Sequence, residues 1–185
     1  MGVIDEYSNI YLVGPMGVGK TTVGRLLAKE LKMRFIDTDH EVERRAGADI
    51  NWIFDVEGET GFRTRESRVL EDVSSGSDQV VSTGGGIILS STNRDKINKG
   101  YCVYLCADSS QLMSRIGNDK KRPLLQTNDP KSLLENIIKF RDPLYREVAQ
   151  LVIQASSGPP RQLAKEIVKS LKLSRDAKCN QRSLL

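Results

Sequence analysis

One short stretch of the chain has the residue types and spacing of a phosphate-binding loop. Residues 14–21 read Gly-Pro-Met-Gly-Val-Gly-Lys-Thr and match the P-loop pattern G-x-x-x-x-G-K-[ST] at every fixed position. Glycines let backbone amides turn toward phosphate oxygens, at positive φ angles that residues with side chains resist. Lys20 can reach the β- and γ-phosphates, and the Thr21 hydroxyl can ligate Mg²⁺. The stretch predicts a nucleoside triphosphate site formed by Gly14, Gly17, Val18, Gly19, Lys20, Thr21 and Thr22.

The sequence on either side of this loop predicts the strand and the helix that must position it. The apolar residues 10–13 predict a strand, and residues 22–31 have helical spacing. The other predicted strands are 34–36, 79–83, 101–106 and 151–153. Helical patterns fill the gaps between them, and the last helix is predicted over 161–173. We therefore expect an α/β three-layer sandwich with a five-stranded parallel sheet, of the P-loop NTPase fold and the nucleoside monophosphate kinase type.

Length, charge and cysteine content narrow the classes of protein. The 185 residues suit one compact domain, expected over 1–173, with a polar and disordered tail over 174–185. The net charge of +4 without a long basic run favours small anionic substrates over nucleic acid. No apolar stretch approaches the roughly 20 residues of a membrane span. We therefore expect no membrane partner. Three cysteines without a C-x-x-C spacing indicate reduced thiols, so we expect a cytoplasmic protein.

A second group of candidate residues closes the second predicted strand. Asp37-Thr38-Asp39 should lie at the carboxyl edge of the sheet, where ligands of such sheets bind. The usual Walker B aspartate is absent, because the third predicted strand ends at Thr83 and a glycine triplet. One carboxylate can then support Mg²⁺ while the other faces a hydroxyl acceptor. The residues alone leave an equal alternative, in which Asp39 caps the helix that follows.

Several motifs follow the P-loop in a defined order. They are Asp-Thr-Asp at 37–39, Ile-Phe-x-x-x-Gly-Glu-x-x-Phe-Arg-x-x-Glu at 53–66, Gly-Gly-Gly at 84–86, Arg-Pro-Leu-Leu at 122–125 and Arg-x-x-Leu-Tyr at 141–145. In this order, over about residues 8–170, the chain resembles the shikimate kinase family. The resemblance implies transfer of the γ-phosphate of ATP to the 3-hydroxyl of shikimate, with Mg²⁺ as cofactor. That reaction is a step of chorismate and aromatic amino acid biosynthesis.

The resemblance also implies roles for single residues, with an acceptor-binding region over 38–72. Arg63 and Arg141 would hold the shikimate carboxylate, since a planar guanidinium makes bidentate contacts. Asp39 would bind shikimate hydroxyls and act as general base, and Asp37 would lie beside Mg²⁺ with Thr21. The amides of the glycine triplet would approach the acceptor, namely those of Gly84, Gly85 and Gly86. The alternatives are an ion pair of Arg63 with Glu66 and an ordinary tight turn at the triplet.

The remaining implied roles concern the far side of the nucleotide. Residues 117–129 resemble a mobile lid, from which Arg122 would neutralise charge on the transferred phosphoryl group. Lys20, Asp39 and Arg122 would thus be the catalytic residues. Arg115 would stack on adenine, with Pro160 on the opposite side. Because residues 155–160 depart from the arginine-containing sequence of the family, Pro159 stays open as the alternative to Pro160.

Two other functions stay open at this point. The first is a kinase for another small molecule, such as gluconate or AMP, built on the same architecture. The second is a non-catalytic nucleotide-binding relative, which would usually have lost the P-loop lysine, an acidic residue or the acceptor arginines. All of these residues are retained, which favours an enzyme. Nothing in the sequence suggests a large apolar interface, and the resemblance implies a monomer.

Overall fold

The computed structural model describes the backbone of residues 9–116, 129–156 and 158–182, and side chains as far as 173. Its strands are β1 (Asn9–Val13), β2 (Arg34–Asp37), β3 (Gln79–Ser82), β4 (Tyr101–Cys106) and β5 (Leu151–Gln154). Its helices are α1 (Lys20–Leu31), α2 (Thr38–Ala46), α3 (Ile50–Ser74), the 3₁₀ turn η1 (Ile87–Leu89), α4 (Ser91–Ile97), α5 (Ser109–Ile116), α6 (Pro130–Val148) and α7 (Pro160–Arg182). All five predicted strands are present, within one residue or so of their predicted ends.

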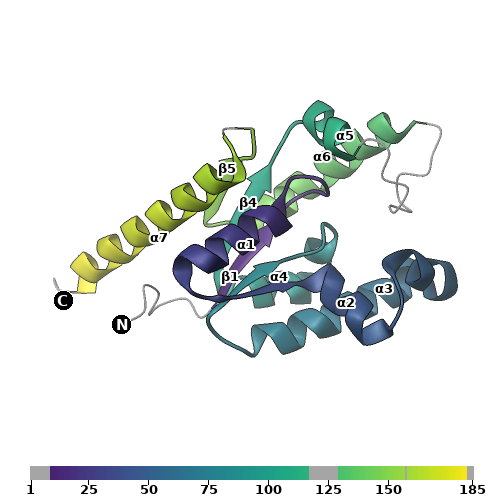
Figure 1. Cartoon of the computed structure of the whole chain (residues 1–185), viewed down its shortest axis with the longest axis horizontal. Helices are drawn as coiled ribbons and strands as arrows, with labels where there is room; N and C mark the ends of the chain where they lie inside the picture. The colour runs from purple at the N-terminus through teal and green to yellow at the C-terminus, as the bar shows by residue number, and fades with distance from the viewer. Residues whose placement is uncertain (1–8, 117–128, 157, 183–185) are drawn as a thin grey trace.

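The five strands form one parallel sheet in the order β2-β3-β1-β4-β5 (Figure 1). Parallel strands require crossovers, and helices supply each of them here. The predicted three-layer sandwich is therefore confirmed. The register pairs Ser82 of β3 with Asp37 on one side and with Leu12 on the other. The carboxyl ends of β1, β2 and β3 thus meet at one edge of the sheet, where the P-loop and the Asp-Thr-Asp motif begin.

Side chains of alternate residues along the strands fill two separate cores. Ile10 and Leu12 of β1 pack on one face of the sheet with α1, α5 and α7. Tyr11 and Val13 point to the opposite face, where they pack with α3, α4 and α6. Because all these residues are almost completely buried, both faces of the sheet are covered, as a parallel sheet requires. The site described below therefore rests on a closely packed support.

Two features of the helices differ from the sequence prediction. The last helix runs to Arg182, so the expected disordered tail from residue 174 is wrong at least as far as 182. Residues 174–182 contain no glycine or proline, and nothing in the local sequence stops a helix there. Within α3, Gly58 has φ 70° and ψ −179°, so this element is two helices joined at a kink. A residue with a side chain would resist that backbone conformation.

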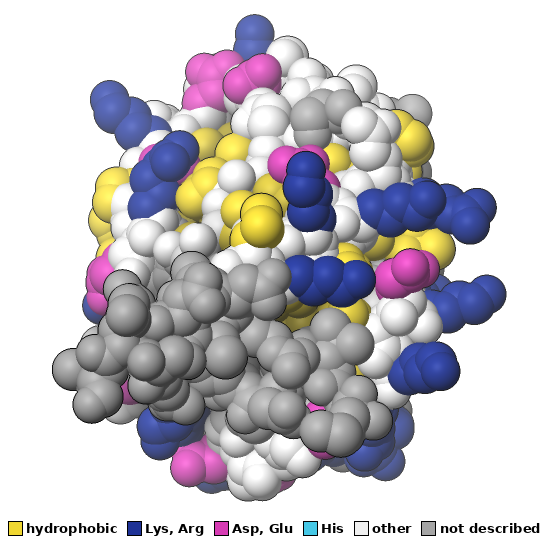
Figure 2. Space-filling model, turned by 90° about the vertical axis from the view of Figure 1, so that its left-hand side faces the viewer, with side chains coloured by type: hydrophobic (Ala, Val, Ile, Leu, Met, Phe, Trp, Pro, Cys, Tyr) yellow, Lys and Arg dark blue, Asp and Glu magenta, His cyan; other side chains and the backbone are white. Residues whose placement is uncertain are grey.

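Among the described residues, no helix is both long and apolar enough to cross a bilayer. Figure 2 shows the side of the molecule at which α7 ends. Lys and Arg side chains on its described part are dispersed among acidic and apolar ones, with no continuous basic stripe.

Candidate active site

A cavity of about 740 Å³ lies at the carboxyl edge of the sheet, between the P-loop and the helices α2 and α3. Most of the residues predicted for the nucleotide and the acceptor line this one cavity. These are Gly17, Gly19, Lys20, Thr21, Thr22, Asp37, Asp39, Arg63, Gly84, Gly85, Gly86 and Arg141. Segments far apart in sequence are thus brought together as expected for a two-substrate site.

The P-loop has the backbone conformation that its glycines predict. Gly14, Gly17 and Gly19 have φ angles of 140°, 75° and 101°. A Cβ atom on Gly14 would lie 2.2 Å from the carbonyl oxygen of Leu105, so this position also lacks space for a side chain. The loop leads directly into α1, whose amino terminus begins at Lys20. Its amides and the helix dipole therefore face the same cavity, which suits an anion.

The Lys20 side chain is buried against the loop that it follows. Its ammonium donates to the carbonyl oxygens of Gly14 at 2.8 Å and Pro15 at 2.9 Å. A phosphate oxygen in the cavity would be a stronger, charged acceptor than these carbonyls. Lys20 is therefore placed to contact a phosphate group that enters the loop.

Oxygen atoms of three side chains meet beside the start of α1. The Thr21 hydroxyl donates to Asp37 Oδ2 at 2.7 Å, and the Ser82 hydroxyl lies 3.5 Å from that of Thr21. Asp37 Oδ1 accepts from the amides of Asp39 and His40, so Asp37 is the N-cap of α2. The capping alternative considered for Asp39 is therefore wrong, because the cap lies two residues earlier. Hydroxyl and carboxylate oxygens are hard ligands, and the group fits a Mg²⁺ ion.

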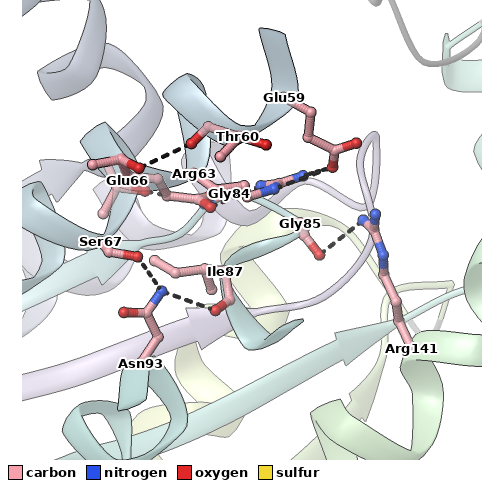
Figure 3. A network of polar contacts seen from close by, with 12 residues as sticks. Glu59, Thr60, Arg63, Glu66, Ser67, Gly84, Gly85, Ile87, Asn93 and Arg141 are labelled. Carbon is pink, nitrogen blue, oxygen red and sulfur yellow. Dashed lines mark hydrogen bonds and ion pairs between the residues drawn. The ribbon is translucent and has the colours of Figure 1, made fainter. Parts of the chain in front are cut away.

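A buried carboxylate lies behind the first acceptor arginine. Arg63 Nη1 is 2.7 Å from Glu66 Oε2, one turn along α3, and Arg63 also contacts the more exposed Glu59 (Figure 3). Burial raises the pKa of Glu66 above its usual value, and the positive charge of Arg63 opposes that rise. The ion pair of Arg63 with Glu66, given above as the alternative, is thus present. Arg63 still lines the cavity, so the pair does not exclude the acceptor role.

Arg141, the second acceptor arginine, comes from α6 on the opposite side of the cavity. Its side chain is largely buried, and Nη1 donates to the carbonyl oxygen of Gly85 at 3.1 Å (Figure 3). The Tyr145 hydroxyl donates to the same carbonyl oxygen. One guanidinium nitrogen of Arg141 is thus bonded to the backbone, and this hydrogen bond sets the orientation of the rest of the guanidinium group. Arg63 and Arg141 therefore approach the glycine triplet from two sides.

Each glycine of the triplet contacts a different part of the site. A Cβ atom on Gly84 would lie 2.3 Å from Glu66 Oε1 and 2.6 Å from Asp39 Oδ1. One on Gly86 would lie 2.3 Å from Arg63 Nη2. One on Gly85 would meet the P-loop at 3.4 Å, from the Gly14 carbonyl oxygen, which is an ordinary contact. The triplet therefore lies where the aspartate, the glutamate and the arginine converge, which an ordinary turn would not require.

The loop after the triplet is tied to the helix that bears Arg63. The buried Asn93 amide donates to the Ser67 hydroxyl at 3.0 Å and to the Ile87 carbonyl at 3.2 Å (Figure 3). Ser67 follows Glu66 on α3, and Ile87 follows Gly86. The contact therefore joins the two segments that flank the Arg63 guanidinium.

Four of the other predicted residues are described and do not line this cavity: Gly14, Val18, Arg115 and Pro160. Val18 is buried in the core, and its carbonyl accepts from Arg115 Nη1 at 3.3 Å. Arg115 thus contacts the backbone of the P-loop, whereas Pro160 is an exposed residue at the first turn of α7. Arg122 and the lid expected over 117–129 lie outside the described residues except for Asp129, which caps α6.

Three residues of the site were not predicted as functional. From sequence, Glu66 is only a partner of Arg63, although its carboxylate also lies beside Gly84. Thr38 is the middle residue of Asp-Thr-Asp, and it is fully buried and accepts from the Gly84 amide. Tyr145 ends the Arg-x-x-Leu-Tyr motif, and its hydroxyl donates to the Gly85 carbonyl oxygen. Each of these three residues belongs to a sequence motif, but no local sequence pattern indicates the contact that it makes with the glycine triplet.

Comparisons with known proteins agree with this geometry. A family model described as "SKI: Shikimate kinase" matches residues 16–172. The chain belongs to the shikimate kinase family. Two family relatives named shikimate kinase are those of Hahella chejuensis, 48% identical over 91% of this chain and 88% of the relative, and Acinetobacter baylyi, 50% identical over 89% and 92%.

Solved structures place the fold in the same family. Shikimate kinase from Acinetobacter baumannii in complex with shikimate superposes with a TM-score of 0.88 at 50% identity, over 91% of this chain and 94% of that chain. The Aquifex aeolicus shikimate kinase gives 0.78 at 34% identity, over 91% and 98%. A gluconokinase from Sinorhizobium meliloti gives 0.58 at 17% identity, over 95% and 98%, a likeness of fold alone.

Proposed function

We propose that the chain is a shikimate kinase, which transfers the γ-phosphate of ATP to the 3-hydroxyl of shikimate and yields shikimate 3-phosphate and ADP. The observation that carries this proposal is the shared cavity. The P-loop lines it on one side, and two arginines with an aspartate line it on the other. Family membership and the shikimate complex of the Acinetobacter baumannii enzyme support the choice of acceptor.

The P-loop side of the cavity would bind the triphosphate. The amides of the loop and the Lys20 ammonium would contact the phosphate oxygens, and Thr21 and Asp37 would hold Mg²⁺, with Asp37 acting through a coordinated water. When bound, Mg²⁺ would neutralise charge on the phosphate oxygens. Because Asp37 also caps α2, a change at the metal side would be transmitted to the helix that bears Asp39.

The opposite side of the cavity would orient shikimate. Arg63 and Arg141 would hold its carboxylate, while Asp39 would accept hydrogen bonds from its hydroxyls. Asp39 would also take the proton of the reacting hydroxyl as the new phosphate ester bond forms. A strong base is unnecessary, because phosphoryl transfer passes through a loose transition state in which positioning matters most.

The Gly84 amide already donates to Thr38, at 3.0 Å. The triplet amides that we assign to the acceptor and the transferred phosphate are therefore those of Gly85 and Gly86. Gly84 itself would contribute by leaving space for Asp39 and Glu66. This division refines the sequence prediction, which treated the three amides alike.

The roles on the far side of the nucleotide remain proposals from sequence. Arg122 would reach the transferred phosphate from a lid over 117–129, and Arg115 and Pro160 would flank adenine. We further propose a monomer that acts in the cytoplasm. Cys102 and Cys106 are free thiols, in keeping with a reducing compartment.

Release of ADP from purified protein with MgATP tests the proposal when shikimate, gluconate, AMP and no acceptor are compared. We expect stimulation by shikimate alone. Nucleotide binding without turnover on any acceptor would support the non-catalytic nucleotide-binding relative instead, and turnover on gluconate or AMP would support another kinase. Asp39→Asn is the matched variant, since an enzyme should lose turnover while its affinity for ATP stays unchanged.

A further inference from the structure

The glycine triplet is held from both sides by buried hydroxyl groups. Thr38 Oγ1 accepts from the Gly84 amide at 3.0 Å, and the Tyr145 hydroxyl donates to the Gly85 carbonyl oxygen. Thr38 is fully buried and Tyr145 is 1% exposed. The two contacts span 46 and 60 residues of sequence, so they join β2–α2 and α6 to the loop after β3. Neither hydroxyl is a ligand in the mechanism described above.

We propose that Thr38 and Tyr145 are positioning residues that set the affinity for the acceptor by holding the triplet at the centre of the site. The inference rests on the proposed function, because the acceptor is taken to be shikimate. It adds to that function the Thr38 and Tyr145 hydroxyls, which would keep the acceptor-binding residues in place.

Packing fixes the Tyr145 hydroxyl as a donor at a defined place. Its ring stacks on that of Tyr104, with centroids 4.8 Å apart and planes inclined by 24°. Burial raises the pKa of the Tyr145 phenol, so the group keeps its proton. A rigid, protonated phenol can hold the Gly85 carbonyl in one direction without the entropy cost of a flexible side chain.

A small displacement of the glycine triplet would move several side chains of the acceptor site at once. Gly84 lies beside Asp39 and Glu66, and Gly86 lies beside Arg63, at distances that leave no room for even one added carbon atom. A shift of the backbone by a few tenths of an ångström therefore moves the groups that bind the hydroxyls and the carboxylate. Closely packed groups of this kind are nearly incompressible, so a displacement of one group is transmitted to its neighbours.

Arg141 depends on the same carbonyl. Its Nη1 shares the Gly85 oxygen with Tyr145. Without the phenol, Arg141 would be the remaining side-chain donor to that oxygen among the described residues. Its guanidinium would then be drawn toward the backbone and away from the acceptor carboxylate. Both effects weaken acceptor binding, and neither removes a hydrogen bond of the P-loop lysine or of the metal ligands.

Two variants remove one hydroxyl each, and two others serve as matched controls. Tyr145→Phe deletes the donor to Gly85, and Thr38→Val deletes the acceptor of the Gly84 amide. Tyr104→Phe deletes the hydroxyl of the stacked partner, which bonds to Asp142 and not to the triplet. Thr38→Ser keeps the hydroxyl and tests recovery from the effect of Thr38→Val.

The measurements are KM for shikimate and for ATP, the dissociation constant of shikimate by calorimetry, and the midpoint of thermal unfolding. We expect Tyr145→Phe and Thr38→Val to raise both shikimate constants about tenfold, the scale of one lost hydrogen bond. KM for ATP should change less than about twofold, and Tyr104→Phe should leave the shikimate constants near the wild-type values. Thr38→Ser should recover most of the affinity.

The outcomes separate this inference from the proposed function. Wild-type protein without shikimate-dependent turnover would overturn the function itself. Active wild-type protein with unchanged shikimate constants in Tyr145→Phe would overturn only the positioning role. An equal loss in Tyr104→Phe would also overturn it, because general packing would then explain the effect. If Thr38→Val fails to fold, Tyr145→Phe alone decides.

Discussion

Arg63 and Glu66 form an ion pair at 2.7 Å in which the glutamate side chain is 1% exposed and the arginine side chain 22% exposed. The Glu66 carboxylate thus balances the charge of Arg63 on its buried side, while the Arg63 guanidinium still lines the cavity. A buried pair of this kind contributes orientation more than stability, because desolvation offsets much of the attraction between the two charges. We infer that Glu66 sets the direction of the Arg63 fork toward the acceptor.

Glu66→Gln should therefore weaken acceptor binding and stability together. We expect KM for shikimate to rise about tenfold and the free energy of unfolding to fall by about 1–3 kcal/mol, since the Arg63 charge would lose its buried counter-charge. Glu59→Gln is the control, because Glu59 also contacts Arg63 but is half exposed and should contribute less than about 1 kcal/mol. A fall in KM for Glu66→Gln would show that Glu66 mainly neutralises Arg63.

Asp39→Asn keeps the size of the side chain and removes its ability to accept a proton. We expect kcat to fall at least about 100-fold, the usual contribution of a general base. The affinity for ATP, measured by calorimetry, should stay within about twofold, because Asp39 lies on the acceptor side of the cavity. A variant with near wild-type kcat would remove Asp39 from the proton transfer.

Alanine substitutions within the triplet should have unequal effects. At Gly84, the added carbon would fall 2.3 Å from Glu66 Oε1 and 2.6 Å from Asp39 Oδ1, so one carboxylate must move. At Gly85, the nearest atoms would lie 3.4–3.6 Å away, which is ordinary contact. We expect Gly84→Ala to lose at least about tenfold in kcat/KM for shikimate, and Gly85→Ala to lose much less. The reverse order would contradict the arrangement described for the triplet.

Glu41 on α2 provides a pH-dependent prediction about stability. Hydrogen bonds from Arg44 and Arg45 lower its pKa from 4.5 to about 2. A lowered pKa means that the unfolded state binds the proton more readily, so the stabilisation is present above pH 4.5 and is lost as the pH falls toward 2.

Urea unfolding of wild-type protein and Glu41→Gln at several pH values measures this effect. We expect the variant to be less stable at pH 7 by at most about 1 kcal/mol, the range of partly exposed pairs. The difference should shrink below pH 4.5 and vanish only below pH 2, where Glu41 is protonated in the folded state and both side chains are uncharged. A difference that stays constant with pH would exclude the ion pairs as its source.

The sequence predicted the fold because each strand is a short buried apolar run with a helical pattern after it. It failed at the end of α7, where polar residues without glycine or proline were interpreted as disorder although nothing there stops a helix. The Gly58 kink in α3 was missed for a related reason. A single glycine inside a helical pattern does not show whether the helix continues or bends.

Local motifs were also sufficient for much of the candidate site. The P-loop conformation and the Arg63–Glu66 pair follow from spacings within one loop or one helical turn. The contacts of Thr38 and Tyr145 with the triplet could not be predicted in this way, since they join residues 46 and 60 positions apart. Such contacts depend on the strand order and on how α6 packs against the sheet.

Identification of the product tests the central claim most directly. Wild-type protein is incubated with MgATP and shikimate, and the product is examined by mass spectrometry and by phosphorus–proton correlation NMR. We expect a singly phosphorylated shikimate whose phosphorus couples to the proton on carbon 3. Phosphorus on another hydroxyl would contradict the acceptor orientation, and the absence of any phosphorylated shikimate would contradict the proposed function.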